Sequence, residues 1–191
     1  MYHRRGKKVN ILCKLEQSGG KCIIMGNQER NSFVCGAITD ALLELLHDKK
    51  IQEISIGEIT EKAQVSRNSF YRNFTSKEDI LRKRIRGYLA EWKKEAEAAD
   101  NKDPKHLYAL LFYRAEYHKE FFLTLKNAGL LYLLQDEFFM AFGPSDDDND
   151  IAAYSKAFFT YSTFGFLETW IRRGMKESAA EMESLLTDHH L

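Results

Sequence analysis

The segment from Arg67 to Asn73 reads Arg-Asn-Ser-Phe-Tyr-Arg-Asn and carries side chains that can recognise nucleic-acid bases. An arginine guanidinium can bind O6 and N7 of guanine through two hydrogen bonds, and an asparagine amide can bind N6 and N7 of adenine in the same way. Serine and tyrosine hydroxyls can donate to phosphate oxygens. In a helix, Phe70 and Phe74 would lie on one side and leave the polar residues outward. These residue types favour recognition of duplex DNA, and the competing interpretation is a solvated surface helix.

Two short helices must hold this segment in place, and the sequence marks the start of each. Residues 55–58 read Ser-Ile-Gly-Glu, a capping box in which the Ser55 hydroxyl accepts from the backbone N–H of Glu58 and the Glu58 carboxylate accepts from that of Ser55. Ser66 can cap the second helix after a tight turn. Two short helices around a tight turn are typical of a helix-turn-helix, although helical hairpins also serve other roles. We expect the pair over residues 56–63 and 67–74.

The rest of the chain shows the apolar spacing of longer helices. Val34, Ile38, Leu42 and Leu45 recur every three or four positions, and only two prolines interrupt the whole sequence. No segment alternates between apolar and polar residues as a half-buried strand would. The sequence therefore predicts an all-α fold of about nine helices. Longer helices are expected over residues 31–47, 77–99 and 150–175. Two or three more are expected between Pro104 and residue 142, through residues 121–123 and 130–142. A short last helix is expected over residues 178–188.

Charge is distributed unevenly, although Lys plus Arg and Asp plus Glu are both 28 in the 191 residues. Residues 1–100 hold 19 basic and 14 acidic side chains, whereas residues 101–191 hold 9 and 14. A basic half followed by an acidic half suits a chain that meets a polyanion at one end. Residues 1–30 are basic and lack an apolar period. We interpret them as a mostly disordered tail. Two explanations of the tail stay open: it is a basic arm that contacts DNA phosphates, or it is an extension upstream of a true translation start at Met25.

Several classes of function find no support in the sequence. The cysteines Cys13, Cys22 and Cys35 have no metal-binding or redox spacing and predict free thiols in a reducing compartment. No run is apolar enough to cross a membrane, so we expect a cytoplasmic protein without a membrane partner. The Asp-rich stretch at residues 146–150 lacks the glycine and the glutamate of a calcium loop. We expect no catalytic residues, no cofactor and no metal site, and hence no enzyme activity.

Residues 54–81 resemble the DNA-binding signature of the TetR (tetracycline repressor) family of bacterial regulators. That signature has a Ser or Thr cap, an Ile-Ala-like helix, a turn ending in Val-Ser, a Tyr-x-x-Phe pair, and Ser-Lys-Glu at the start of the next helix. The stretch ISIGEITEKAQVSRNSFYRNFTSKEDIL supplies all of these in order. The matching residues are Ser55, Ile59 with Ala63, Val65 with Ser66, Tyr71 with Phe74, and Ser76, Lys77 and Glu78.

The resemblance implies a domain organisation and a set of DNA contacts. A three-helix helix-turn-helix domain over residues 31–76 would bind a double-stranded DNA operator. A helical ligand-binding and dimerisation domain over residues 77–191 would follow, beginning with a connecting helix over residues 77–99. Side chains from the second short helix would enter or border the major groove, while Ser55 and Lys77 would meet phosphates. The implied DNA contacts are Ser55, Arg67, Asn68, Ser69, Tyr71, Arg72, Asn73 and Lys77.

Two residues depart from the family pattern. Gln64 stands where the family usually has glycine in the turn. A left-handed backbone at glutamine costs about 1 kcal/mol or more, so we expect a slightly altered turn. Asn73 stands where the family commonly has histidine, which would change one phosphate or base contact.

The second half of the chain is rich in aromatic residues, which suit either a packed core or a pocket for a small apolar ligand. The resemblance implies that this half senses an effector and forms a homodimer through residues 151–188. Such a dimer would present two reading helices to a palindrome with half-sites about 34–36 Å apart. The effector would tilt the helix over residues 77–99 and change that separation. The candidate ligand-contacting residues are Trp92, Phe112, Tyr113, Phe138, Phe159 and Phe164.

The sequence thus favours a TetR-like one-component transcriptional regulator, with repressor action following family habit. The alternative is a TetR-like ligand sensor that acts through a protein partner, for which Arg67 and Tyr71 would be the anchoring residues. Salt distinguishes the two, because DNA affinity falls by about 0.9 log units per phosphate contact for each log unit of salt.

Overall fold

The structure is a computed structural model that describes residues 27–100 and 103–188. Within these residues the chain is all-helical and contains no strand, which confirms the predicted fold class. The elements are α1 (Asn27–Leu45), a 3-10 turn η1 (Ile51–Glu53), α2 (Ile56–Lys62), α3 (Arg67–Asn73), α4 (Lys77–Ala98), α5 (Pro104–Tyr117), α6 (Lys119–Asn127), α7 (Leu131–Phe142), α8 (Asp150–Arg172) and α9 (Ala179–Asp188).

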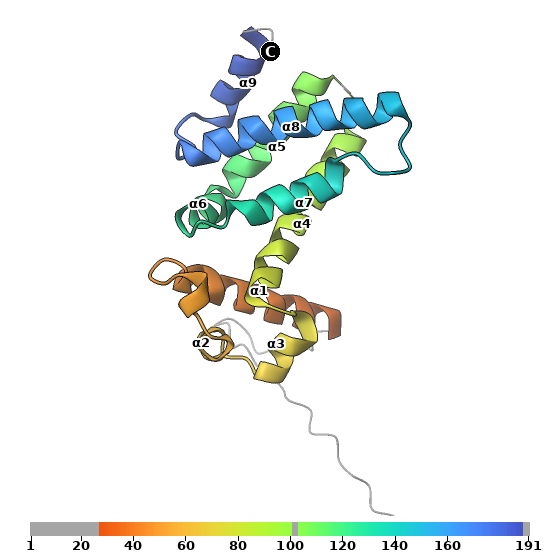
Figure 1. Cartoon of the computed structure of the whole chain (residues 1–191). Coiled ribbons are helices and arrows are strands. Elements are labelled where there is room, and N and C mark those ends of the chain that lie inside the picture. The colour runs from red at the N-terminus through yellow and green to blue at the C-terminus, as the bar shows by residue number, and fades with distance from the viewer. Residues whose placement is uncertain (1–26, 101–102, 189–191) are drawn as a thin grey trace, which may run out of the picture.

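Helices α1, α2 and α3 form one end of the molecule, and α4 runs from this end into the bundle of the remaining helices (Figure 1). We call α1–α3 the head and α5–α9 the body. The head has its own apolar centre, in which α1 packs on α2, α3 and α4. The fully buried side chains that make this centre are Ile38, Leu42, Ile51, Ile54, Ile59 and Phe70.

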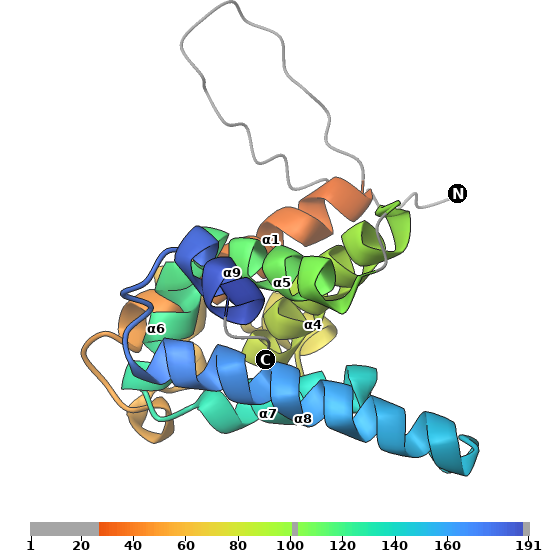
Figure 2. The same ribbon diagram turned by 90° about the horizontal axis from the view of Figure 1, so that it is seen from above.

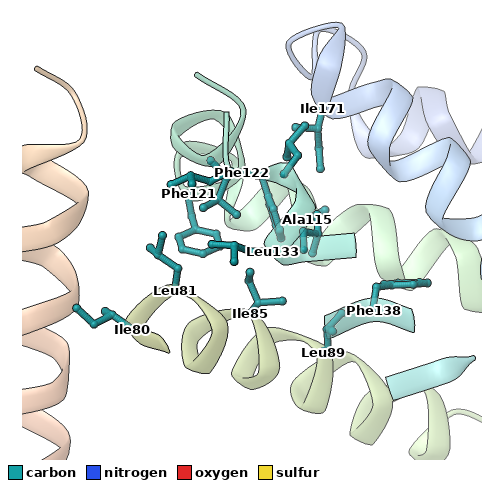
Figure 3. Packing of buried hydrophobic residues seen from close by; sticks show 14 of the residues in the cluster. Ile80, Leu81, Ile85, Leu89, Ala115, Phe121, Phe122, Leu133, Phe138 and Ile171 are labelled. Atoms are coloured by element: carbon teal, nitrogen blue, oxygen red, sulfur yellow. The ribbon is translucent and has the colours of Figure 1, made fainter. Parts of the chain in front are cut away.

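Helix α4 belongs to both parts because it buries residues against each of them. Figure 3 shows Ile80 on the side of α4 that faces the pale orange helix α1, and Leu81, Ile85 and Leu89 among side chains of the body. All four residues belong to one continuous apolar cluster that extends from the head into the body. Burial of apolar surface stabilises a fold by about 25 cal/mol for each Å². The apolar stripe on α4 is buried in both parts, so it stabilises the packing of α4 against each of them. Helix α4 therefore joins the apolar centre of the head to that of the body.

The body is a layered helical bundle in which α5 packs against α9, and α7 packs against both α4 and α8. Seen from above, α8 extends past the other helices at its N-terminal end (Figure 2). Phe112, Phe138 and Trp170 are fully buried between these helices. The extended half of α8 is left with few neighbours, so its outward residues face solvent.

One boundary predicted from the sequence is wrong. Helix α1 begins at Asn27, so residues 27–30, which we expected in the tail, are helical. The Arg30 guanidinium donates to the Asn27 side-chain oxygen across 2.7 Å. An apolar stripe is not needed in this turn, because glutamine, glutamate and arginine are good helix formers even when exposed. The rest of the predicted tail, residues 1–26, lies outside the described residues.

Candidate DNA-binding surface

The start of α2 is fixed by the capping box expected from the sequence. The Ser55 hydroxyl accepts from Glu58 N at 3.1 Å, and the Glu58 carboxylate accepts from Ser55 N at 2.8 Å. Lys49 donates to the other Glu58 oxygen at 2.6 Å. Together the hydrogen bonds from Lys49 and Ser55 lower the pKa of Glu58 from 4.5 to about 2. The carboxylate is therefore charged at neutral pH and holds the helix start against the loop before it.

The turn between α2 and α3 places its strain at one residue. Gln64 adopts a left-handed backbone with φ of 54°, so the turn keeps the conformation that glycine would favour instead of the altered one that we expected. The next residue, Val65, donates its N–H to Thr60 O at 2.9 Å and so closes the end of α2. Ser66 then caps α3, because its hydroxyl accepts from Ser69 N at 3.1 Å. The angle between the two short helices is thus set by local hydrogen bonds.

Helix α3 turns its aromatic residues inward and its polar residues outward. Phe70 is fully buried and Phe74 is 3% exposed, and their rings pack with centroids 5.9 Å apart. The Tyr71 ring packs edge-on against Phe70, yet 61% of the residue remains exposed. Four of the predicted DNA contacts are exposed on this helix: Arg67, Asn68, Tyr71 and Arg72.

The other two predicted DNA-contacting residues on α3, Ser69 and Asn73, form side-chain hydrogen bonds within α3 and to its cap. Ser69 shares a 2.9 Å hydrogen bond with the Ser66 hydroxyl, and Asn73 donates its side-chain amide to Ser69 O at 2.9 Å. Asn73 is half-buried rather than exposed. One N–H of its amide is engaged with the helix, which leaves the second N–H and the side-chain oxygen for another partner. The role of Asn73 suggested by the structure is to stabilise the last turn of α3.

Lys77, a predicted phosphate contact, is also used within the fold. Its ammonium donates to Ile51 O at 2.5 Å and to Ile54 O at 2.6 Å. These two bonds tie the start of α4 to η1 and leave one ammonium N–H for another acceptor. Ser55 keeps its hydroxyl proton for donation, because in the capping box its oxygen acts as the acceptor. Both residues therefore remain able to bind phosphate while they support the backbone.

Two residues that the sequence did not single out also shape this surface. A Cβ at Gly57 would come within 2.9 Å of a terminal nitrogen of Arg67, so glycine makes room for that guanidinium. Lys83 of α4 donates to Asn73 O and lies over the Phe74 ring, 4.9 Å from its centroid. It thus caps the C-terminal end of α3, where a cation is favoured by the helix dipole. Both contacts join distant segments, so no local pattern in the sequence marks them.

The candidate ligand-contacting residues do not gather around one cavity. Trp92 lines a small cavity of about 20 Å³ in the body, together with Leu89, His118 and Leu134. Three other candidates are buried in the apolar core, Phe159 is half-buried against the Tyr108 ring, and Tyr113 is 47% exposed. The three core residues are Phe112, Phe138 and Phe164. None of these positions tests the ligand prediction, and all six remain predictions.

In the described ranges, no three or more side chains of His, Cys, Asp or Glu are grouped as a metal site would need. Across those same ranges no helix combines the length and apolarity that a membrane span requires.

The capped pair α2–α3, packed on α1 with a polar exposed face on α3, is a helix-turn-helix DNA-binding domain. Residues 38–83 match the family model described as bacterial regulatory proteins, tetR family. This match covers α2, α3, the C-terminal part of α1 and the first turns of α4, so the head carries a DNA-binding domain of the tetR type, and a helical domain follows it in the described residues. No curated protein matches the chain.

Proposed function

We propose that this protein binds a palindromic DNA operator as a homodimer and acts as a repressor that a small apolar effector releases. The observation that carries the DNA part is the exposed face of α3. Arg67, Asn68, Tyr71 and Arg72 are free of the fold's own hydrogen bonds among the described residues, and each can reach a base edge or a phosphate. Their helix is held by a buried ring and by caps at both ends. The proposed role needs no catalytic step.

Selection from random duplex DNA tests the operator. The wild-type chain, Arg67→Ala and Tyr71→Ala would be compared with Lys176→Ala, an exposed lysine of the body. We expect the wild type and Lys176→Ala to enrich the same palindrome. Loss of the Arg67 guanidinium should weaken operator binding by about 1–3 kcal/mol, or roughly tenfold to a hundredfold, without changing thermal stability.

Salt dependence decides between DNA and a protein partner. Operator binding through phosphates must weaken with a slope of about −0.9 for each phosphate contact in a plot of log affinity against log salt. If a folded wild-type dimer enriches no sequence at low salt, operator binding is contradicted. The exposed Arg67 and Tyr71 would then be tested as contacts to a protein by pull-down.

The dimer is proposed from an apolar stripe on α8. Ile151, Tyr154, Phe158 and Tyr161 are between 64% and 81% exposed, and they recur at spacings of three, four and three residues. Gly165 continues the same row as an exposed small residue. Apolar residues with this spacing form a seam that another helix can cover. A second copy of the chain supplies such a helix, because a two-fold axis brings the same stripe to itself.

Light scattering at several protein concentrations tests the dimer. Phe158→Glu introduces a charge in the middle of the stripe, and Tyr117→Glu introduces the same charge at an equally exposed tyrosine of α5. We expect Phe158→Glu to be monomeric and to lose the palindrome, while Tyr117→Glu stays dimeric. A Phe158→Glu chain that remains dimeric would place the interface elsewhere.

The effector is proposed to act by opening the body around α4. The cavity of about 20 Å³ is lined by Leu89 and Trp92 of α4 and has room for little more than one water. A larger ligand must therefore displace α4 or its neighbours, and α4 also carries the head. Compounds that raise the thermal stability of the chain would be assayed for operator release. If none of the stabilising compounds changes DNA affinity, the effector part of the proposal fails.

Ion pairs between α4 and α7 supply a route for this movement. Arg82 lies 2.7 Å from Asp136 and 3.2 Å from Glu137, and Arg86 lies 3.0 Å from the second oxygen of Glu137. Glu137 is 3% exposed, so its carboxylate depends on these two guanidinium groups. A shift of α7 would thus pull on α4 one to three turns from the head.

A further inference from the structure

A second hollow lies outside the body, between α1 and α4 and beside the end of α3. Its volume is about 300 Å³. This is the lower end of the range in which proteins bind small molecules, about 300–1,000 Å³. The residues that matter for the argument are Cys35 and Gly36 of α1 and Lys83, Arg84, Gly87 and Tyr88 of α4.

Two glycines open this cleft from opposite sides. Gly36 lies inside α1 and Gly87 inside α4, where glycine destabilises a helix relative to alanine. A Cβ at either position would meet no atom within 4 Å, so the packing of the described residues does not require glycine there. What the two glycines do is widen the cleft. Both glycines lower the stability of their helices and keep this space open. We therefore expect a bound molecule, rather than another side chain of the folded chain, to fill the cleft.

The charges in the cleft favour an anion. Arg84 Nε is buried and has no hydrogen-bond partner among the described residues, while its guanidinium lies over the Tyr88 ring, 5.6 Å from the centroid. The nearest acid to Arg84 is the exposed Asp40, at 3.8 Å, which is a weak pair. Lys83, which pairs with Asp79 at 3.5 Å, adds a second cation. The one acidic residue of the lining, Glu91, lies 3.9 Å from Arg114 of the body.

We propose that the cleft between α1 and α4 binds a small molecule that joins an anionic group to a flat apolar body. The anion would pair with the Arg84 guanidinium and accept from the Lys83 ammonium. The apolar part would lie between Gly36 and Gly87, where a Cβ at either position would meet no atom within 4 Å.

Occupancy of this cleft bears on the head directly. Lys83 donates to Asn73 O and so holds the C-terminal end of α3. An anion that draws Lys83 toward Arg84 would release that end, and DNA binding would weaken. This consequence rests on the proposed operator function, whereas the binding site does not.

The occupancy can be read from Cys35, which lines the cleft and is half-buried. In a full-length chain with Cys13→Ser and Cys22→Ser, the rate of Cys35 modification by a thiol reagent is measured at one fixed pH. The probes are 2-naphthoate and its neutral counterpart naphthalene-2-methanol. We expect 2-naphthoate to slow the modification several-fold and saturably, and the neutral probe to have little effect.

Variants assign the protection to the cleft. Arg84→Gln should abolish it, whereas Lys93→Gln, at an exposed lysine further along α4, should keep it. Gly87→Leu fills the cleft, and calorimetry should then detect no 2-naphthoate binding to a chain of unchanged helix content. Retained binding in Arg84→Gln, or equal protection by both probes, overturns the proposal. So does a Cys35 that is unreactive without any probe, because another part of the chain would then fill the cleft.

The DNA arm is measured separately. Operator affinity of the wild-type chain is compared with and without saturating 2-naphthoate, and we expect a loss that Arg84→Gln prevents. Unchanged affinity with a protected Cys35 would overturn the regulatory consequence and leave the site. Absence of operator binding without any probe contradicts the proposed function instead.

Discussion

In the head, α2 and α3 each begin at a serine whose hydroxyl accepts from a backbone N–H, namely Ser55 and Ser66, and Ser76 caps α4 in the same way. In the body, α6 and α7 begin at His118 and Leu130 with no such side-chain cap. Two other body helices, α8 and α9, are capped by Asn149 and Ser178, so the contrast with the head lies in α6 and α7, which are held by packing between distant segments. Local bonds let the polar face of α3 remain free, whereas Phe112, Phe138 and Trp170 at the centre of the body are buried by packing.

This difference suits the two tasks that we propose, DNA reading by the head and effector binding by the body. A DNA-reading helix must keep its backbone fixed while its side chains are exposed, and caps achieve that without using the outward residues. A sensing domain must rearrange when a ligand enters, and helices held by side-chain packing can shift between alternative packings. The four predictions below test this contrast, beginning with the largest effect.

Truncation of the buried ring under α3 should show that the head depends on one core residue as well as on its caps. Phe70→Ala removes a fully buried ring and should lower the free energy of unfolding by about 3–5 kcal/mol. Tyr71→Ala, at the exposed neighbour, should change it by less than about 1 kcal/mol. Urea unfolding followed by circular dichroism measures both. Similar losses in the two variants would show that α3 is not anchored by Phe70.

The ion pairs between α4 and α7 should matter according to burial. Glu137→Gln leaves two guanidinium groups facing a neutral amide at a buried position, and we expect a loss of about 1–3 kcal/mol. Asp136→Asn removes a carboxylate that is 48% exposed and should cost less than about 1 kcal/mol. Thermal unfolding of both variants gives the comparison, and a larger loss for Asp136→Asn would reverse our assignment.

One substitution should have opposite signs in the two parts. Gln64→Gly relieves a left-handed glutamine in the turn of the head and should stabilise the chain by up to about 1 kcal/mol. Gln135→Gly, at an exposed position inside α7, should destabilise it by about 1 kcal/mol. Chemical unfolding measures the pair. A loss in both would mean that the turn at residue 64 tolerates glutamine without strain.

The smallest effect concerns acid. The pKa of Glu58 is lowered to about 2, chiefly by the hydrogen bond from Lys49, so the folded state binds its proton less readily than the unfolded state does. The resulting stability is present above about pH 4.5 and is lost as the pH falls toward 2. Glu58→Gln should therefore flatten the stability profile over this range. Glu61→Gln, at an exposed residue of the same helix, is the control, and an equal flattening there would exclude the capping box as the cause.

The head could be predicted from the sequence because its determinants are local. The capping box at residues 55–58 and the cap at Ser66 each follow from residues within four positions of one another, and the structure contains both. The inward side of α3 was likewise predicted by the spacing of Phe70 and Phe74. The expected alteration of the turn is not seen, because Gln64 adopts the left-handed backbone that glycine would favour. The start of α1 was also placed wrongly, because polar helix formers carry no apolar period.

Tertiary structure alone decided which predicted contacts are free and where the hollows lie. The sequence gives no sign that Lys77 binds the carbonyl oxygens of Ile51 and Ile54, or that Lys83 closes the end of α3. Nor does it separate a packed aromatic residue from one that lines a cavity, since both have the same helical spacing. The physical reason is that caps and turns depend on neighbours in the chain. Burial, ion pairing and cavities depend on which helices pack against one another. That packing is determined jointly by residues far apart in the sequence.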